Sequence, residues 1–120
     1  MRAAALGMAL LLLAGTARAE CGFTTEEKVM LGVFYGLLLA DRNQTRNAMR
    51  SGNAVETNPF IGRHPTPETI DAWALGIGSF MAVAACQTSG QVRSFLLGFI
   101  IGAEFAAVRT NAAVGFSAGF

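Results

Sequence analysis

The chain has 120 residues, which is enough for a single domain. Hydrophobic residues make up 52% of it and charged residues only 14%, against the roughly 25% of an average soluble domain. The formal net charge is +1, so no basic field argues for nucleic-acid binding. Together with the 14 glycines, this composition is typical of a helical membrane protein.

The N-terminus has the features of a secretory signal peptide. Arg2 supplies the positive charge, residues 3–14 form an apolar segment, and residues 17–19 (Ala-Arg-Ala) form a small-x-small cleavage site. The sequence therefore predicts a signal peptide over residues 1–19, with Glu20 as the first mature residue. Two alternatives stay open. One is an uncleaved first anchor, and the other is a lipid on Cys21, which the residues before that cysteine disfavour.

A first helix is expected over residues 25–49. Thr24 and Glu27 have the spacing of a capping box, which satisfies backbone N–H groups at a helix start. The uncharged run at 29–40 covers only ~18 Å, short of the ~30 Å hydrocarbon core of a bilayer. Asp41, Thr45 and Ala48 continue the helical spacing, so the second half of this helix is expected to be polar.

Two further helices are expected over residues 67–86 and 91–111. Thr66 as N-cap and Pro67 at the first helical position mark the start of the earlier one. Residues 72–92 carry no charge, and this length is enough to span a bilayer, although residues 87–91 have the pattern of a turn. Thr88 and Gln91 have the spacing of a second capping box, and Glu104 lies inside the last helix. Residues 112–120 are rich in Gly and Ala and give only a weak prediction.

Small residues recur four positions apart in all three expected helices, a spacing that lets apolar helices approach closely in membranes. These sets are Gly32/Gly36/Ala40, Ala74/Gly78/Ala82 and Gly98/Gly102/Ala106. The alternative is that a chain rich in Gly and Ala produces such spacings by chance.

A polar loop is expected over residues 50–66. Pro59 makes Asn58 extended or part of a turn. Gly62 can adopt a positive φ, and Pro65 and Pro67 bar a helix from continuing. Phe60 and Trp73 lie near helix ends and are typical of anchors at a membrane surface, with core packing as the alternative.

The basic residues predict an orientation across a membrane. Lys28 and Arg93 are the basic residues expected on one side, whereas five arginines are expected on the other: Arg42, Arg46, Arg50, Arg63 and Arg109. The positive-inside rule places these five arginines and the C-terminus in the cytoplasm. Cleavage of the signal peptide independently places the N-terminus of the mature chain outside.

Polar residues are expected to converge at the cytoplasmic end of the bundle, because ionisable groups near a membrane interior usually pair or mark a functional path. The candidates for one hydrogen-bonded network are Asp41, Gln44, Thr45, Glu56, Asn58, His64, Glu104 and Asn111.

Glu104 is the first of these to single out. The simplest expectation is a structural ion pair with Arg42, Arg46 or Arg109. A metal site has suitable ligand types here but no diagnostic spacing, and no nucleophile motif is present. The sequence therefore predicts no catalytic residue, no metal and no cofactor.

The two cysteines are expected to meet. Cys21 precedes the first helix and Cys86 ends the second, so antiparallel helices bring both to the outer side, where disulfides persist. A Cys21–Cys86 disulfide is predicted, with two separate thiols as the alternative.

Two polar segments carry a resemblance. Residues 41–45 have the pattern D-x-x-Q-T, and residues 56–65 have the pattern E-x-N-P followed by two apolar residues, then G-x-x-P. With Glu104 and Asn111 in the last helix, this resembles a group of small uncharacterised bacterial and phage proteins over most of the mature chain. The resemblance implies an apolar helical fold and no catalytic activity.

The sequence as a whole predicts an all-α protein, a small three-helix membrane bundle integral to the bacterial inner membrane. Its expected role is structural or interaction-based, with membrane lipids, a second copy of itself or another membrane protein as partners. Two alternatives stay open: a membrane-embedded enzyme that uses the carboxylates, and an exported soluble helical protein of the periplasm.

Overall fold

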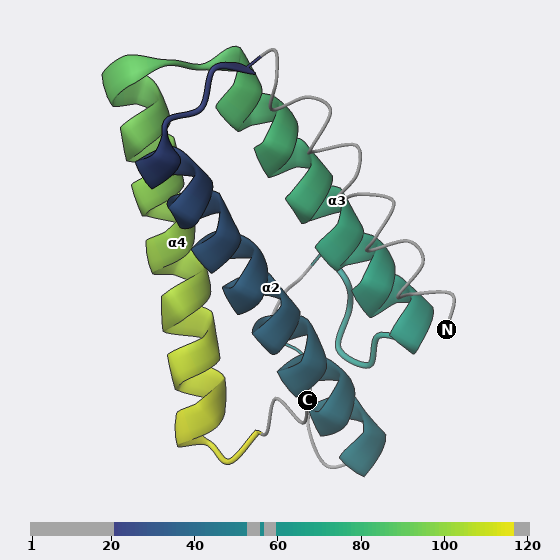
Figure 1. Ribbon diagram of the computed structural model, residues 1–120. Coiled ribbons are helices and arrows are strands. Elements are labelled where there is room, and N and C mark those ends of the chain that lie inside the picture. Colours follow the sequence, from purple (N-terminus) through teal and green to yellow (C-terminus); the bar gives the residue numbers. More distant parts are fainter. Residues whose placement is uncertain (1–20, 53–55, 57–59, 117–120) are drawn as a thin grey trace.

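The computed structural model describes residues 21–52, 56 and 60–116 (Figure 1). These segments contain three helices, α2 (Thr25–Ser51), α3 (Pro67–Gln87) and α4 (Gly90–Ala113), and no strand. The ranges expected from the sequence agree with these bounds to within two residues at each end. The predicted signal peptide at 1–19 and the network candidate Asn58 lie outside the described residues.

The starts of α2 and α3 follow the local sequence. The Thr24 hydroxyl accepts the Glu27 N–H at 3.1 Å, and the Glu27 carboxylate accepts the Thr24 N–H at 2.9 Å, which completes the capping box. In α3 the Thr66 hydroxyl accepts the Thr69 N–H at 3.2 Å, one position before Pro67. These bonds satisfy N–H groups that have no partner within the helix.

The capping box expected at the start of α4 is wrong. Ser89 is the N-cap of α4 and makes no side-chain cap bond. Thr88 instead donates its hydroxyl to the carbonyls of Ala84 at 2.9 Å and Ala85 at 3.3 Å. With only two residues between the helices, Thr88 satisfies the free carbonyls of α3 rather than the free N–H groups of α4.

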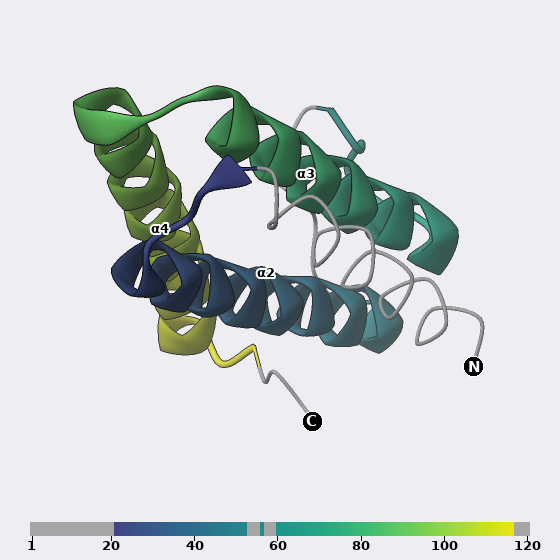
Figure 2. The same ribbon diagram turned by 45° about the horizontal axis from the view of Figure 1, so that its top comes forward.

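Helix α2 lies between the other two helices and packs against both, whereas α3 and α4 contact each other little (Figures 1 and 2). Helix α4 runs in the same direction as α2, and α3 runs in the opposite direction. Two small clusters form the core: Leu31, Ala85 and Leu97 at one level, and Phe34, Leu38 and Met81 at the next. Two ends result. The disulfide end holds Cys21 and Cys86, and the arginine end holds the C-terminal halves of α2 and α4.

Helices α2 and α3 approach each other closely at Gly78. A Cβ atom there would lie 3.3 Å from the Tyr35 ring and 3.4 Å from Leu38. The Tyr35 hydroxyl donates to the Gly78 carbonyl at 2.9 Å. The absence of a side chain at residue 78 thus allows an aromatic ring of α2 to lie against the α3 backbone.

The other small-residue faces do not pack inside the chain. Gly32 and Gly36 of α2 and Gly98 and Gly102 of α4 are exposed, and a Cβ at any of them would meet nothing within 4 Å. Of the three small-residue sets, that of α3 therefore lies against a neighbouring helix, at Gly78, whereas the glycines of the α2 and α4 sets do not. Their spacing is right for close packing, but the helices are rotated so that these faces point outward.

Large apolar side chains lie on the outside of the bundle. Helices α3 and α4 are each long and apolar enough to cross a membrane. Phe80 of α3 is 67% exposed, and Phe95 and Phe99 of α4 are 75% and 65% exposed. The rings of Phe95 and Phe99 stack on the surface of α4. Much of the apolar content of these helices is therefore not used in the core.

Replacing Gly78 with Leu should destabilise the protein, because the new side chain would displace Tyr35 and Leu38. The cost expected from overpacking is about 1–3 kcal/mol. The matched control is Gly76→Leu, since Gly76 is on the same helix with open space around it. Thermal unfolding followed by circular dichroism measures both. Equal losses of stability in the two variants would contradict the close contact at Gly78.

Candidate functional site

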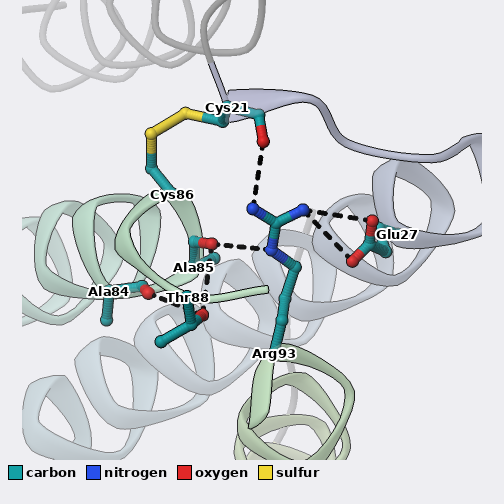
Figure 3. Close-up of a disulfide and its surroundings, with 7 residues drawn as sticks. All are labelled: Cys21, Glu27, Ala84, Ala85, Cys86, Thr88 and Arg93. Atoms are coloured by element: carbon teal, nitrogen blue, oxygen red, sulfur yellow. Dashed lines mark hydrogen bonds and ion pairs between the residues drawn. A yellow bond between two sulfur atoms is a disulfide. The ribbon is translucent and has the colours of Figure 1, made fainter. Parts of the chain in front are cut away.

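The disulfide end is held together covalently. Cys21, just before α2, and Cys86, in the last turn of α3, form a disulfide with their Cα atoms 4.9 Å apart (Figure 3). This is the pairing predicted from the sequence. It closes a loop of 65 residues that contains α2 and most of α3. Such a closure reduces the conformational freedom of the unfolded chain and so favours the folded one.

Arg93 lies beside this disulfide and is only 5% exposed, although it is charged. Its Nε donates to the Ala85 carbonyl at 2.8 Å, and its Nη2 donates to the Cys21 carbonyl at 3.0 Å (Figure 3). Its Nη1 lies 3.2 and 3.3 Å from the two carboxylate oxygens of Glu27. The guanidinium thus contacts the segment before α2, the first turn of α2 and the last turn of α3.

An aromatic ring completes this environment. The guanidinium carbon of Arg93 is 4.6 Å from the centroid of the Phe23 ring, a cation–π geometry. We call Cys21, Phe23, Glu27, Ala85 and Arg93 the Arg93 cluster. The sequence predicts Arg93 only as a basic residue of the outer side. The available signal was a lone arginine in the first turn of an apolar helix, with an acidic residue at the start of another helix.

Glu27 belongs to both the capping box and the Arg93 cluster. The hydrogen bond from the Thr24 backbone N–H is the largest cause that lowers the pKa of the Glu27 carboxyl below its usual 4.5. Burial opposes this effect, and the hydrogen bonds and charge of Arg93 lower the pKa further. The ionised form is therefore favoured in the folded protein. Glu27 stabilises the fold above its usual pKa, and this contribution is lost as the pH falls through the lowered value.

A second polar cluster joins α2 to α4 nearer the arginine end. Asn111 of α4 donates from Nδ2 to the Asp41 carboxyl at 3.0 Å and to the Gln44 side-chain oxygen at 3.2 Å. Gln44 is buried and donates in turn to the Val108 carbonyl at 3.1 Å. One amide from each helix therefore bridges the helix pair.

The carboxyl of Glu104 faces that of Asp41 within hydrogen-bonding reach. The Glu104 Oε2 atom is buried and has no hydrogen-bond partner. Glu56 adds further negative charge near Asp41. Two ionised carboxylates so placed repel, whereas one proton between them allows an O–H···O bond. We call Asp41, Gln44, Glu104 and Asn111 the carboxyl cluster.

The other described candidates, Thr45, Glu56 and His64, are not part of the carboxyl cluster as defined. Thr45 is half-buried one position after Gln44 on α2. The Glu56 backbone N–H bonds to the Arg63 carbonyl at 2.9 Å, within the loop. His64 is exposed in that loop and takes part in none of the cluster contacts described above.

The expected ion pair between Glu104 and an arginine is wrong for the part of the chain that the structure describes. Arg42 Nε lies 2.7 Å from the Asp71 carboxyl and Arg46 Nη1 lies 3.5 Å from it. Asp71 begins the second turn of α3, so these arginines join α2 to α3. Neither of them pairs with Glu104 of α4. The rotation of α2 decides this, because Asp41 and Arg42 point about 100° apart around the helix axis.

The chemistry available to these side chains is hydrogen bonding and proton exchange. Among residues 21–52, 56 and 60–116, no group of three or more His, Cys, Asp or Glu is placed to hold a metal ion. The comparisons with known proteins give no match to a protein-family model, to a curated protein or to a solved structure. The structure itself is therefore the basis for any functional proposal.

Replacing Glu27 with Gln should destabilise the protein by about 1–3 kcal/mol at neutral pH, because Arg93 loses a charged partner. The difference from the unmodified protein should shrink as the pH is lowered below 4.5, since Glu27 then loses its charge in both states. Thermal unfolding between pH 7 and pH 3 measures this. Glu26→Gln is the control at the exposed neighbour. A pH-independent difference for Glu27→Gln would contradict the ion pair.

Replacing Glu104 with Gln should leave stability unchanged or increase it, because an amide can donate to Asp41 and removes the repulsion between two carboxylates. Asn111→Leu should cost about 1–3 kcal/mol, since Asp41 and Gln44 both lose a donor. Thermal unfolding of the two variants at the same pH compares them. A large loss with Glu104→Gln and none with Asn111→Leu would overturn this account of the cluster.

Proposed function

We propose that the chain, after removal of residues 1–19, is a small integral protein of the bacterial inner membrane with a structural or interaction role. The observation that carries this proposal is the outward apolar surface of α3 and α4, both long and apolar enough to cross a membrane. The bacterial assignment rests on the signal-like N-terminus and on the resemblance of residues 41–45 and 56–65 to bacterial and phage proteins.

The exposed phenylalanines favour lipid over water as the surroundings of the bundle. Phe80, Phe95 and Phe99 are each about two-thirds exposed or more, and they belong to the two candidate spans. Burying apolar area is favourable by about 25 cal/mol per Å². An exported soluble protein of this size would need another surface to cover them, whereas a bilayer covers them without a specific partner.

The uncharged segment of α3 is short for a membrane span. Residues 72–86 of α3 are uncharged and rise only ~22 Å, less than the ~30 Å of an average hydrocarbon core. A bilayer can thin locally around a short span. The Phe60 and Trp73 rings stack with their centroids 5.6 Å apart at the arginine end, as expected of aromatic anchors at a membrane surface.

The two ends of the bundle support one orientation. Arg42, Arg46 and Arg50 lie at the arginine end, and the positive-inside rule places this end in the cytoplasm. The disulfide lies at the other end, and disulfides persist in an oxidising compartment such as the periplasm. At that end Arg93 is neutralised by Glu27, which reduces its weight as a topological signal.

The polar contacts support a structural role. Each of three polar side chains bonds to a part of the chain other than its own helix. Arg93 of α4 bonds to Cys21, Asp71 of α3 to Arg42 of α2, and Asn111 of α4 to Asp41 of α2. Paired polar groups of this kind fix how helices sit against one another. What the protein does for its host is then to present a surface within or beside the membrane, to lipids, to a second copy or to another membrane protein.

Alkaline carbonate extraction of bacterial membranes tests the location. We expect the mature chain to stay in the membrane pellet, because the outward apolar faces of α3 and α4 hold it in lipid. A known periplasmic soluble protein and a known inner-membrane protein serve as the two controls. Quantitative release of the chain into the supernatant would overturn the proposal in favour of an exported soluble protein.

Reporter fusions test the orientation in the same cells. A fusion after Phe120 should be active only with a cytoplasmic reporter, and one at Ser89 only with a periplasmic reporter. The opposite pattern would contradict the orientation while leaving membrane insertion untouched.

A further inference from the structure

Asp41 of α2 and Glu104 of α4 bring two hydrogen-bond acceptors into contact. Their carboxyl groups lie within hydrogen-bonding reach of each other. An ionised carboxylate only accepts hydrogen bonds, whereas a protonated carboxyl also donates one. The contact is therefore attractive when one hydrogen lies between the two groups, and repulsive when both groups are ionised.

The neighbouring amides use their hydrogens elsewhere. Asn111 Nδ2 donates to Asp41 Oδ1 at 3.0 Å and to Gln44 Oε1 at 3.2 Å, so both hydrogens of this amide have acceptors. Gln44 donates to the Val108 carbonyl at 3.1 Å. The Glu104 Oε2 atom is buried, and no donor in the described part of the chain reaches it. An oxygen that has lost water without gaining a donor is a poor place for a negative charge.

The cations at this end of the bundle do not neutralise the two carboxyls. The charged or titratable side chains on the surrounding elements are Arg42, Arg46 and Arg50 of α2, Glu56, Arg63 and His64 of the loop, Glu68 and Asp71 of α3, and Arg109 of α4. Arg42 and Arg46 share Asp71, at 2.7 and 3.5 Å. Glu56 adds negative charge near Asp41, and the other groups are exposed. One proton shared by the pair would both reduce the repulsion and supply the missing hydrogen bond.

Helix α4 is held differently at its two ends. Its first turn is fixed by Arg93, which bonds to Cys21, Glu27 and Ala85. Figures 1 and 2 show α3 and α4 diverging from their short connection, so α2 is the main neighbour of the C-terminal half of α4. The polar contacts described for that half are those of the carboxyl cluster with α2. A repulsion between Asp41 and Glu104 therefore acts on the end of α4 that has the fewest other contacts.

We propose that Asp41 and Glu104 form a proton-binding site, which holds one proton at neutral pH and thereby stabilises the packing of the C-terminal half of α4 on α2. In the protonated state, the O–H group of one carboxyl donates to an oxygen of the other. On release, the O–H bond breaks, the proton passes to water and the electron pair stays on the carboxyl oxygen. Both side chains are half-buried rather than fully enclosed, so the proton can exchange with water.

Release of the proton leaves two negative charges facing each other, which weakens the contact between α2 and α4. The packing of these helices therefore responds to pH. In the proposed membrane orientation the site faces the cytoplasm, although the site itself needs only the folded chain and not a membrane.

Infrared spectroscopy of the purified mature protein in a neutral detergent tests for the proton. Ordinary Asp and Glu side chains are ionised at neutral pH, because their usual pKa values are about 4. A protonated carboxyl has a C=O stretching band that a carboxylate lacks. We expect this band in the unmodified protein at neutral pH and its loss as the pH is raised. Glu104→Gln should abolish it, whereas Glu68→Gln, an exposed carboxylate at the same end, should leave it unchanged.

Equilibrium unfolding at a series of pH values, followed by circular dichroism, tests the effect on packing. In the unfolded chain the two carboxyls lose their protons near their usual pKa values of 3.8 and 4.5. The stabilisation by the shared proton is therefore fully present below these values and is lost as the pH rises through the range in which the folded pair releases it.

The matched comparison is between the unmodified protein and Glu104→Gln, whose amide can donate to Asp41 at every pH. Above the usual carboxyl range, the unfolding constant of the unmodified protein should rise by up to about tenfold per pH unit relative to that of Glu104→Gln. This rise should stop where the infrared band is lost. The profile of Glu68→Gln should run parallel to that of the unmodified protein.

Three results would overturn the inference. Absence of the protonated band at neutral pH would mean that both carboxyls are ionised. Persistence of the band in Glu104→Gln would place the proton on another group. Parallel stability profiles for the unmodified protein and Glu104→Gln would mean that the pair does not couple pH to packing. Carbonate extraction reports on the membrane location alone, so its outcome is distinguishable from all three.

Discussion

The burial of the Arg93 guanidinium is the constraint on which the rest of this structure depends. A charge taken out of water destabilises a protein unless every donor finds an acceptor and the charge finds a partner. Glu27 supplies the charge, and the carbonyls of Cys21 and Ala85 supply acceptors. These groups come from two different helices and the segment before α2. The charge of Arg93 can therefore be satisfied only when all three helices meet at this end.

The disulfide and the Arg93 cluster stabilise the same end of the bundle. The Cys21–Cys86 bond holds the segment before α2 against the end of α3, which brings the Cys21 and Ala85 carbonyls to the same side of the Arg93 head. The Thr88 hydroxyl bonds to the Ala84 and Ala85 carbonyls, so the end of α3 has few unsatisfied groups. Because the connection from α3 to α4 has only two residues, the first turn of α4 is held close to both cysteines.

At the arginine end, two faces of α2 make polar contacts with different helices. Arg42 and Arg46 pair with Asp71 of α3. Asp41 and Gln44 accept hydrogen bonds from Asn111 of α4. The carboxyl of Glu104 is then left facing Asp41 rather than a cation. A neutral amide can stabilise such a pair because it donates hydrogen bonds without adding charge. Between the two polar ends lie the small clusters around Leu31 and Phe34 and the outward phenylalanines.

The sequence by itself determined the helices and their starts. Capping bonds and proline positions act within about four residues, so Thr24, Glu27, Thr66 and Pro67 fixed two helix starts without reference to the rest of the chain. It also determined that the two cysteines would lie at one end, because antiparallel neighbours bring the start of one helix to the end of the next. Only the tertiary structure decided how each helix is rotated about its own axis. A turn of about 100° per residue sends adjacent side chains to different neighbours. That rotation directed Arg42 to Asp71 rather than Glu104, turned Gly32 and Gly98 outward while Gly78 met Tyr35, and buried Arg93, which the sequence marks only as a surface charge.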